Sequence, residues 1–410
     1  MSFMPAKNVQ IIGAGFAGLS LAWLLAQRSC RVEVWERETR VGGLLGTRRL
    51  TSGMAETGAN GILVNAHLVE LCRDIGVEPL FALQASKRRY IWRNGPTRLP
   101  LTLGDILALI ARIGPKLLFN RSALQPRANE TLHAWGLRNL GQGAADYLLA
   151  PAMQGIYAGD SHRMSATLIL QPLFSKKRKK GDPRGLVSFR GGMQELVDAL
   201  EQKCRAAGVV FRRQQATPAD VAVPLPTDTA CVLATSAWDA AALLAQRAPE
   251  LAAQLHMVEI LPLVAVTAFF QNKQEKYPGF GCLFPANAPT RALGVLMNSY
   301  IFAGRDGTYN ETWIFGGARD VAAINLTDQE IFAEISASRQ RLFGLETTIR
   351  ESQITRWPQA LPHYTLPWEA TLRAIPELPG LHLHGNWLGG IGLSHILDRS
   401  HLLAERIARA

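Results

Sequence analysis

The sequence predicts an α/β chain built on a Rossmann-like parallel sheet, with two insertions that form further domains. Three observations lead to this prediction: a glycine-rich βαβ unit in the first fifty residues, a second glycine-rich element near the C-terminus, and alternating helical and strand-like segments between them. With 410 residues, the chain exceeds the usual size of one domain. Two or three domains are therefore expected.

The N-terminal element has the pattern of a complete nucleotide-binding unit. Val9 to Ile12 is a short apolar strand, and Gly13, Gly15 and Gly18 follow it as GxGxxG before a helix expected over Leu19 to Gln27. The first glycine suits the tight turn, the second allows the backbone to approach a pyrophosphate, and the third allows close packing of helix and strand. The phosphates would then meet the positive end of the helix.

The second strand of this unit ends in an acidic residue. Arg31 to Trp35 is the expected strand, and Glu36 follows it, about twenty residues after the glycines. An acidic side chain at this distance accepts hydrogen bonds from the ribose hydroxyls. The agreement of the whole unit makes a purely structural glycine turn improbable.

Two features favour FAD over a nicotinamide cofactor. Arg40 precedes Gly42 and Gly43, and successive glycine amides after an arginine suit anionic oxygens. At the other end, a strand over Leu381 to His384 leads into a glycine-rich loop and a helix over Ser394 to Ala408. A helix N-terminus directed at a flavin stabilises the negative charge of its reduced form. This pair of elements is typical of two-dinucleotide-binding flavoproteins.

Composition limits the partners and the compartment. The net charge of +11 indicates an anionic partner, which can be acidic lipid, nucleic acid or a carboxylated substrate. No aromatic or RNA-binding pattern accompanies the basic residues, so no nucleic acid is expected. The five cysteines have no CxxC or paired spacing, which predicts core thiols, no metal site and a reducing compartment. The first strand begins close to Met1 and no apolar run has spanning length, so neither a signal peptide nor a membrane span is expected.

The order of segments predicts three domains. The FAD-binding domain is expected over 1–75, 185–246 and 345–410, and a second domain with an antiparallel sheet over 76–99 and 247–344. The strand-like segments LPLVAVTAFF, FGCLFP and ALGVLMNSYIF lie in the latter. A mainly helical domain is expected over 100–184.

Eight segments, found in order over nearly the whole chain, carry a closer resemblance. They are AETGANGI, KRRYIWRNG, PAMQGIYAGDSHRMS, SFRGGMQELVDAL, GVLMNSYIF, GGARD, WPQALPHY and GNWLGGIGL. Together they resemble the protoporphyrinogen oxidases of haem biosynthesis, and IYAGDSHRMS followed by SFRGGMQELVDAL is the most specific pair.

The resemblance implies an FAD domain, a substrate-binding domain and a helical membrane-binding domain. It also implies oxidation of protoporphyrinogen IX in three two-electron steps, in which dioxygen reoxidises the flavin and hydrogen peroxide forms. Hydride transfer from an electron-rich carbon to a flavin needs little further machinery. The sequence accordingly assigns no catalytic acid, base or nucleophile. The residues expected to bind FAD are Gly13, Ala14, Gly15, Phe16, Ala17, Gly18, Glu36, Arg40, Gly42, Gly43, Gly58, Ala59, Asn60, Gly385, Asn386, Gly390, Ile391, Gly392 and Leu393.

The resemblance also implies substrate-binding residues. Asn60 matches an asparagine between flavin and substrate, and a turn asparagine is the alternative. Arg89 matches an arginine that pairs with a propionate, for which the guanidinium fork is suited, and a surface arginine is the alternative.

Four further positions match the family near its substrate cavity. Leu296 and Met297 fall where relatives have Leu-Phe in the substrate sheet, and a core methionine is the alternative at the second position. Gly155 and Gly159 fall on glycines of a turn near the cavity, and a tight helix end is the alternative.

Two segments predict a membrane-associated protein. Leu103 to Phe119 is apolar but interrupted by charges, so it suits a membrane interface or an apolar channel rather than a span. Lys176 to Lys180 is a basic run that suits acidic headgroups or, alternatively, a solvated loop. The expected location is the cytoplasm, peripherally on the cytoplasmic face of the membrane.

Several alternatives stay open at this point. Coproporphyrinogen III, with two more propionates, is the nearest alternative substrate. An amine or carotenoid oxidoreductase, or a flavin-bound protein without turnover, would use the same cofactor scaffold. The sequence leaves the oligomeric state open, a homodimer included.

Overall fold

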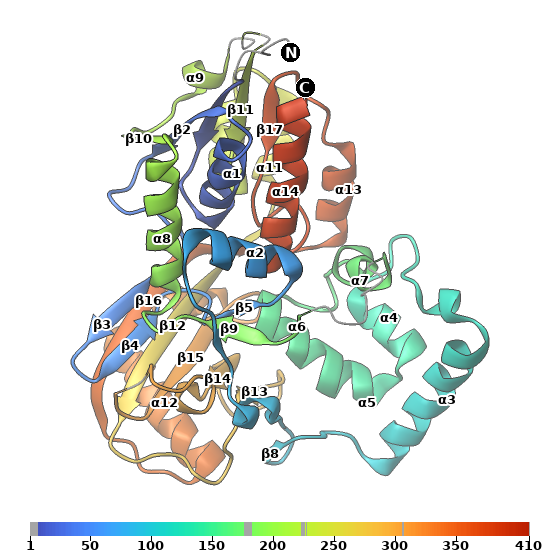
Figure 1. Cartoon of the computed structure of the whole chain (residues 1–410). Helices are drawn as coiled ribbons and strands as arrows, with labels where there is room; N and C mark the ends of the chain where they lie inside the picture. Colours follow the sequence, from blue (N-terminus) through green and yellow to red (C-terminus); the bar gives the residue numbers. More distant parts are fainter. Residues whose placement is uncertain (1–6, 176–182, 223–225, 227, 306, 410) are drawn as a thin grey trace.

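Residues 7–175, 183–222, 226, 228–305 and 307–409 are described by this computed structural model. Figure 1 shows three regions: a sheet domain that carries both chain ends at the top, a second sheet domain at the lower left, and a group of helices at the lower right. The predicted α/β architecture with two sheet-containing parts and one helical part is therefore found.

The first sheet has five parallel strands in the order β10-β2-β1-β11-β17. Its central strand pairs with β2 on one side and with β11 on the other. The strands are β1 (Asn8–Ile12), β2 (Arg31–Glu36), β10 (Val210–Arg213), β11 (Thr229–Leu233) and β17 (Leu381–Leu383). Because these strands come from three distant parts of the chain, their carboxyl ends bring distant loops to one edge of the sheet.

Helices cover both faces of this sheet (Figure 1). They are α1 (Phe16–Ala26), α2 (Ala66–Ile75), α8 (Met193–Ala206), α9 (Pro218–Ala222), α10 (Ala237–Leu244), α11 (Pro249–His256), α13 (Leu366–Ala374) and α14 (Leu393–Arg409). Helix α1 is buried at every position from Phe16 to Leu25 and packs against α8 and α14. Its predicted start at Leu19 was three residues late, because Gly15 caps the helix in an extended conformation and Gly18 lies inside the first turn.

The second sheet has seven strands in the order β16-β12-β15-β14-β13-β7-β8. They are β7 (Arg89–Trp92), β8 (Pro96–Thr97), β12 (Ile260–Phe270), β13 (Gly281–Leu283), β14 (Gly294–Leu296), β15 (Asn310–Gly316) and β16 (Ile349–Pro362). The pairs are antiparallel, as predicted, except that β7 runs parallel to β13. Helix α12 (Asp328–Phe343) contributes Ile331, Ile335 and Leu342 to the apolar core that includes Trp313.

One predicted domain boundary was wrong. Residues 345–410 were assigned to the FAD-binding domain, but β16 pairs along its length with β12 of the second sheet. Residues 345–362 therefore belong to the substrate-binding sheet, and the chain returns to the first sheet only with β17. A strand with a half-buried pattern contains no information about which of two sheets it joins.

Two small sheets connect the domains. One is the hairpin of β3 (Thr47–Leu50) and β4 (Gly53–Glu56), and the other joins β5 (Ile62–Leu63), β9 (Leu186–Ser188) and β6 (Leu80–Phe81). Strand β9 belongs to the second segment predicted for the FAD-binding domain (185–246), and it pairs with both β5 and β6. It therefore holds β6, which lies near the start of the first segment predicted for the substrate-binding domain (76–99).

The predicted helical stretch contains α3 (Leu103–Phe119), α4 (Leu132–Asn139), α5 (Gln142–Ala144), a π-helical turn (Ala145–Leu149), α6 (Ala150–Tyr157) and α7 (Ala166–Ser175). Within the described ranges, none of the helices has both the length and the apolar character required to cross a membrane. The basic run Lys176 to Lys180 lies outside the described residues.

The cysteines are core thiols, as predicted. None of the five forms a disulfide, and four of them, Cys72, Cys204, Cys231 and Cys282, are buried. Burial raises the pKa of the Cys72 thiol to about 11 and of the Cys204 thiol to about 12. These side chains therefore stay protonated and contribute packing rather than reactivity.

Candidate active site

The three glycines of the first loop have different surroundings. Gly13 has φ +104°, and a Cβ there would lie 2.6 Å from the carbonyl oxygen of Ala234. A Cβ on Gly18 would lie 1.9 Å from the carbonyl oxygen of Gly13. A Cβ on Gly15, in contrast, would have its nearest neighbour, the Cα of Gly43, at 4.0 Å. Gly13 and Gly18 are thus required by the fold, whereas the space beside Gly15 is open toward the helix N-terminus, as a bound pyrophosphate requires.

Glu36 ends β2 at the same edge of the sheet. Its Oε2 accepts a hydrogen bond from the amide of Ala14 at 2.8 Å, and its Oε1 accepts one from the amide of Glu38 at 3.0 Å. The carboxylate is therefore fixed beside the glycine loop, and each oxygen retains lone pairs that can accept from ribose hydroxyls.

The predicted second glycine pair lies directly against the first loop. The amide of Gly42 donates to the carbonyl oxygen of Ala14 at 2.7 Å, and both Gly42 and Gly43 have positive φ. The guanidinium of Arg40 donates to the carbonyl oxygens of Val41, Gly43 and Leu45. Arg40 therefore shapes this loop, which explains why an arginine precedes the glycines.

The C-terminal glycine loop reaches the same edge. Gly385 follows β17, and the indole Nε1 of Trp387 donates to the carbonyl oxygen of Thr235 at 2.9 Å. Tyr364 is buried against the loop: its hydroxyl donates to the carbonyl oxygen of Asn386 and accepts from the amide of Gly390 at 3.0 Å. The loop then leads into α14, so that α1 and α14 both begin at the carboxyl edge of the first sheet.

This set of residues fits FAD. The glycine cradle beside Gly15 leaves room for phosphates, Glu36 can hold the ribose, and the two helix N-termini favour negative charge. A further sign is Arg399 on α14, whose Nε is buried and has no hydrogen-bond partner. A buried cation at this edge is consistent with an anionic ligand.

Asn60 lies in the loop that follows β4, together with Gly58 and Ala59. The loop is held by Trp357 of β16, whose Nε1 donates to the carbonyl oxygen of Thr57 at 2.6 Å. A Cβ on Gly58 would lie 2.3 Å from the carbonyl oxygen of Leu44, so the loop also packs tightly against the FAD-domain segment. The loop therefore connects the cofactor domain to the substrate-binding sheet.

A cavity of about 10 Å³, large enough for one water molecule, borders Asn60. Its lining consists of Met54, Glu56, Asn60, Asn298, Ile301, Phe302 and Arg305. Three of these residues belong to the segment GVLMNSYIF, which the resemblance singled out. Asn298 donates to Asn310 Oδ1 at 2.7 Å and to Thr312 Oγ1 at 2.8 Å, so its side chain is fixed.

Two predicted substrate residues share one row of the second sheet. Gly281 of β13 is paired with Arg89 on one side and with Leu296 on the other. Residues in register on neighbouring strands point to the same face, so the side chains of Arg89 and Leu296 lie on one face on either side of Gly281. A Cβ on Gly281 would lie 2.0 Å from the carbonyl oxygen of Val295, so close packing requires the glycine. Arg89 is exposed and its guanidinium lies 4.9 Å from the ring centroid of Phe280.

The other predicted substrate residues are packed inside the protein. Met297 is fully buried in the core of the second sheet, and Gln274 Nε2 lies 3.3 Å from its sulfur. A Cβ on Gly155 would lie 2.4 Å from Leu283, and one on Gly159 would lie 2.7 Å from Met164. The structure therefore gives Met297 the surroundings of a core methionine, and it places both glycines at close packing contacts.

Sequence reasoning missed the residues that hold these loops. They are Glu56, Asn298, Arg305, Tyr364 and Arg399. Glu56, Asn298 and Tyr364 lie within the family-like segments, which was an available signal. Arg305 and Arg399 lie outside them, and a single arginine in a sequence gives no sign that it will be buried.

Comparisons with known proteins agree with this geometry. A family model described as flavin containing amine oxidoreductase matches residues 16–392. The mitochondrial protoporphyrinogen oxidase of Nicotiana tabacum is 27% identical over 475 residues, covering 96% of this chain and 93% of the relative. The coproporphyrinogen III oxidase of Bacillus subtilis is 21% identical, with 96% of each chain covered.

Solved structures show the same fold. A protein assigned as a protoporphyrinogen oxidase from Exiguobacterium sp. 255-15 aligns with a TM-score of 0.78 at 18% identity, and 99% of each chain is covered. Cyclohexylamine oxidase from Brevibacterium oxydans IH-35A aligns with a TM-score of 0.70 at 17% identity, also with 99% of each chain covered. At this level of identity, the likeness concerns the fold and does not distinguish substrates.

Proposed function

This chain belongs to the flavin-containing amine oxidoreductase family and is an FAD-dependent oxidoreductase, and from that premise we propose that it oxidises protoporphyrinogen IX to protoporphyrin IX. The observation that supports the proposal most is the extent of the sequence likeness. The porphyrinogen oxidases of Nicotiana tabacum and Bacillus subtilis each align with 96% of this chain, and with 93% and 96% of their own length.

The proposed reaction removes six electrons in three equal steps. In each step a hydride would pass from a carbon between pyrrole rings to FAD, and one proton would be released. Over the three steps, four of the six hydrogens leave the bridging carbons and two leave pyrrole nitrogens. Dioxygen is the proposed electron acceptor, so three molecules of dioxygen would give three of hydrogen peroxide. The protein has to orient the flat substrate, exclude water and keep the reacting carbon near the flavin.

Asn60 is the residue that we assign to this positioning. Its loop is anchored to the FAD domain through Gly58 and to the second sheet through Trp357. A neutral amide in this place can orient a pyrrole N–H by accepting its hydrogen bond, without adding a charge that would oppose hydride departure. The proton itself can leave to solvent, so no further acid or base is required.

Arg89 and Leu296 are assigned to substrate recognition. The guanidinium of Arg89 suits a propionate, and Leu296, in the same row of the sheet, offers an apolar surface to the macrocycle.

Porphyrin fluorescence tests the proposed reaction. The purified protein with FAD is mixed with protoporphyrinogen IX or with coproporphyrinogen III, and fluorescence and hydrogen peroxide are followed in air. Faster fluorescence from protoporphyrinogen IX supports the proposal, and faster fluorescence from coproporphyrinogen III selects the alternative substrate. Under anaerobic conditions, flavin bleaching by an amine such as cyclohexylamine, and by neither porphyrinogen, would select an amine oxidoreductase. No bleaching by any of them would indicate a flavin protein without turnover.

We also propose that the protein binds peripherally to anionic lipid on the cytoplasmic face of the membrane. Helix α3 supports this proposal because apolar residues line its exposed side, whereas the apolar side of a helix in a soluble protein usually packs against the core. The exposed apolar residues Leu103, Leu107, Ile110, Leu117 and Leu118 follow one side of it, and the exposed Phe119 is its last residue. Leu103 is 80% exposed and Phe119 is 86% exposed.

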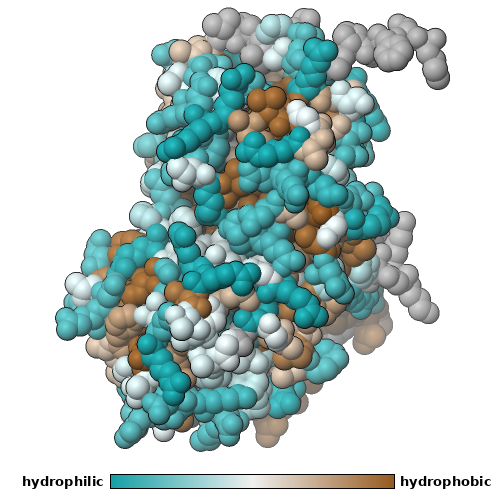
Figure 2. Space-filling model, turned by 60° about the vertical axis from the view of Figure 1, so that its left-hand side comes forward, coloured by the Kyte–Doolittle hydropathy of each residue, from teal (hydrophilic) through white to brown (hydrophobic). Residues whose placement is uncertain are grey.

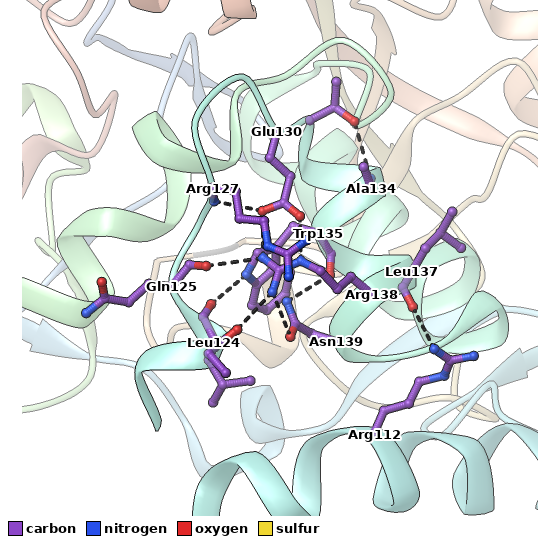
Figure 3. A network of polar contacts seen from close by, with 12 residues as sticks. Arg112, Leu124, Gln125, Arg127, Glu130, Ala134, Trp135, Leu137, Arg138 and Asn139 are labelled. Atoms are coloured by element: carbon purple, nitrogen blue, oxygen red, sulfur yellow. Dashed lines mark hydrogen bonds and ion pairs between the residues drawn. The ribbon is translucent and has the colours of Figure 1, made fainter. Parts of the chain in front are cut away.

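The polar side chains on the other side of α3 bind neighbouring segments of the protein. Asp105 pairs with Arg93 at 2.9 Å, Arg112 donates to the carbonyl oxygen of Leu137 at 3.4 Å, and Lys116 donates to Asn139 Oδ1 at 2.7 Å. Figure 3 shows Arg112 extending from α3 toward α4, where Arg138 binds Glu130. These contacts fix the rotation of α3 and thereby keep its apolar side outward.

The face of the molecule in Figure 2 provides a contrast. It is mainly hydrophilic, and its apolar residues form separate patches. In Figure 1, α3 lies at the outer edge of the helical domain, where its apolar side can meet a membrane surface.

A further inference from the structure

Arg399 holds the C-terminal glycine loop from the side of α14. Its guanidinium donates to the carbonyl oxygens of Gly385, of Gly389 at 2.8 Å and of Gly390 at 3.5 Å. Gly389 and Gly390 both have positive φ, near +100°. A loop of this shape needs its carbonyl groups held, and one arginine side chain satisfies three of them.

Tyr364 holds the same loop from the opposite side. Its hydroxyl contacts the carbonyl oxygen of Asn386 and the amide of Gly390. The loop is thus fixed by one charged side chain, the half-buried Arg399, and one neutral side chain, the buried Tyr364. Variants of these two residues can therefore separate the effect of the charge on a bound flavin from the effect of the loop shape.

The charge of Arg399 is not neutralised by a carboxylate. All three of its partners are carbonyl oxygens, and among the residues that the structure describes it takes part in no ion pair. Its Nε is buried without a partner. Burial lowers the pKa of Arg399, as expected for a cation removed from water. An anion bound nearby would stabilise a cation that has only carbonyl partners and a buried, unpaired Nε.

The position of the loop identifies that anion. A Cβ on Gly13 of the first glycine loop would meet Ala234, and Trp387 of the C-terminal loop donates to the next residue, Thr235. The two glycine loops therefore lie against the same pair of residues at the end of β11. Both belong to the FAD site, and reduced flavin carries a negative charge.

We propose that Arg399 is a positioning residue of the FAD site whose positive charge raises the midpoint potential of the bound flavin. A full charge behind the loop adds to the partial positive charge at the N-terminus of α14, which amounts to about half an elementary charge. Because the dielectric constant inside the protein is low, this charge can act on the flavin across the loop. The inference depends on FAD binding and is independent of which substrate is oxidised.

Redox titration of the purified holoenzyme tests the proposal. Arg399→Gln removes the charge and keeps hydrogen-bond donors, and it should lower the midpoint potential of the flavin. Arg399→Lys keeps the charge but cannot reach three carbonyl groups, so it should bind FAD more weakly and retain most of the potential. Arg406→Gln is the matched control, because it removes the same charge two turns further along the exposed part of α14 and should leave the potential unchanged.

Tyr364→Phe separates loop shape from charge. It removes two contacts of the loop without changing the charge, so it should weaken FAD binding and keep the potential. An unchanged potential in Arg399→Gln, or an equal fall in Tyr364→Phe and Arg399→Gln, would overturn the proposal. If Arg399→Gln fails to fold, the midpoint potential of Arg399→Lys tests the proposal instead. Arg399→Lys keeps the positive charge, so a flavin potential as low as that of free FAD in this variant would contradict a role for the charge.

Discussion

Glu56 and Arg305 form a buried ion pair that joins the Asn60 loop to the substrate-binding sheet. The Glu56 side chain also accepts from the amide of Met193 at 3.0 Å, at the start of α8. Arg305 also donates to Ser188 Oγ at 2.8 Å and approaches the carbonyl oxygen of Asn60 at 3.5 Å. The pair therefore connects three chain segments, 56–60, 188–193 and the segment around Arg305, beside the cavity that borders Asn60.

Removal of one member of this pair should be more costly than removal of both. Arg305→Met leaves the Glu56 carboxylate buried without its partner, and we expect a loss of about 3–5 kcal/mol in the free energy of unfolding. The double variant Glu56→Gln/Arg305→Met should lose less than the single one. Urea unfolding measures both. The exposed pair of Arg212 and Glu33 is the control and should contribute about 1 kcal/mol or less. A loss in the double variant as large as or larger than the loss in Arg305→Met would contradict the coupling.

Gly15 and Gly18 should respond differently to alanine. Gly15→Ala places its Cβ in open space, so the apoprotein should keep its stability while FAD affinity falls. Gly18→Ala places its Cβ 1.9 Å from a carbonyl oxygen, so the protein should lose stability even without FAD. Thermal unfolding of the apoprotein and FAD titration separate the two effects. Equal FAD affinity in wild type and Gly15→Ala would remove this glycine from the cofactor site.

Arg89→Ala should weaken porphyrinogen binding and leave the flavin spectrum unchanged. A charge-assisted contact with a propionate contributes roughly 1.5–3 kcal/mol when partly shielded from water. Arg89→Lys should recover only part of the effect, because an ammonium group lacks the planar fork. Steady-state kinetics on both porphyrinogens measure this, with the exposed neighbour Arg88→Ala as control. An unchanged specificity constant for Arg89→Ala would identify it as an ordinary surface residue.

The apolar side of α3 should determine membrane binding. Replacement of Leu107, Ile110 and Leu118 by serine removes apolar surface from a helix face with no buried contacts, so we expect the fold to persist and vesicle binding to fall about tenfold or more. Vesicle sedimentation measures the change. The exposed residues Met257 and Leu402, replaced by serine, are the control.

The basic run provides a second arm of this test. Neutral replacements of Lys176 to Lys180 should reduce binding to anionic vesicles, by about 1 kcal/mol per charge at most. Unchanged vesicle binding in both the α3 variant and the neutral variant would refute the proposed membrane association.

His384 should make the protein less stable in mild acid. Burial, with a smaller contribution from Arg399, lowers the pKa of His384 to about 3, and its Nε2 lies 2.8 Å from Ser400 Oγ. Between pH 6.5 and 3 the unfolded chain binds a proton here that the folded chain does not, so stability falls as the pH falls, by about 1.4 kcal/mol per pH unit. Urea unfolding at pH 7.5 and 5 should show a smaller pH dependence in His384→Gln than in wild type. The exposed His256→Gln is the control, and a pH dependence equal to that of wild type in both variants would exclude His384 as its source.

The sequence determined the elements whose signals are local. GxGxxG between an apolar strand and a helix, the acidic residue at the end of β2, and the glycine-rich segment before α14 each depend on neighbouring residues, and all were found where expected. FAD as the cofactor followed from these segments and from the family resemblance that they carry.

Only the tertiary structure decided features that depend on residues far apart in the chain. The strand β16 joined the second sheet rather than the first, because strand pairing is set by which partner strand is available and not by the pattern of the strand alone. Arg305 became buried and Arg399 half-buried, because removal of a charge from water requires carbonyl groups or carboxylates that other segments supply. The rotation of α3, which turns its apolar side outward, was likewise fixed by contacts of Asp105, Arg112 and Lys116 with other segments.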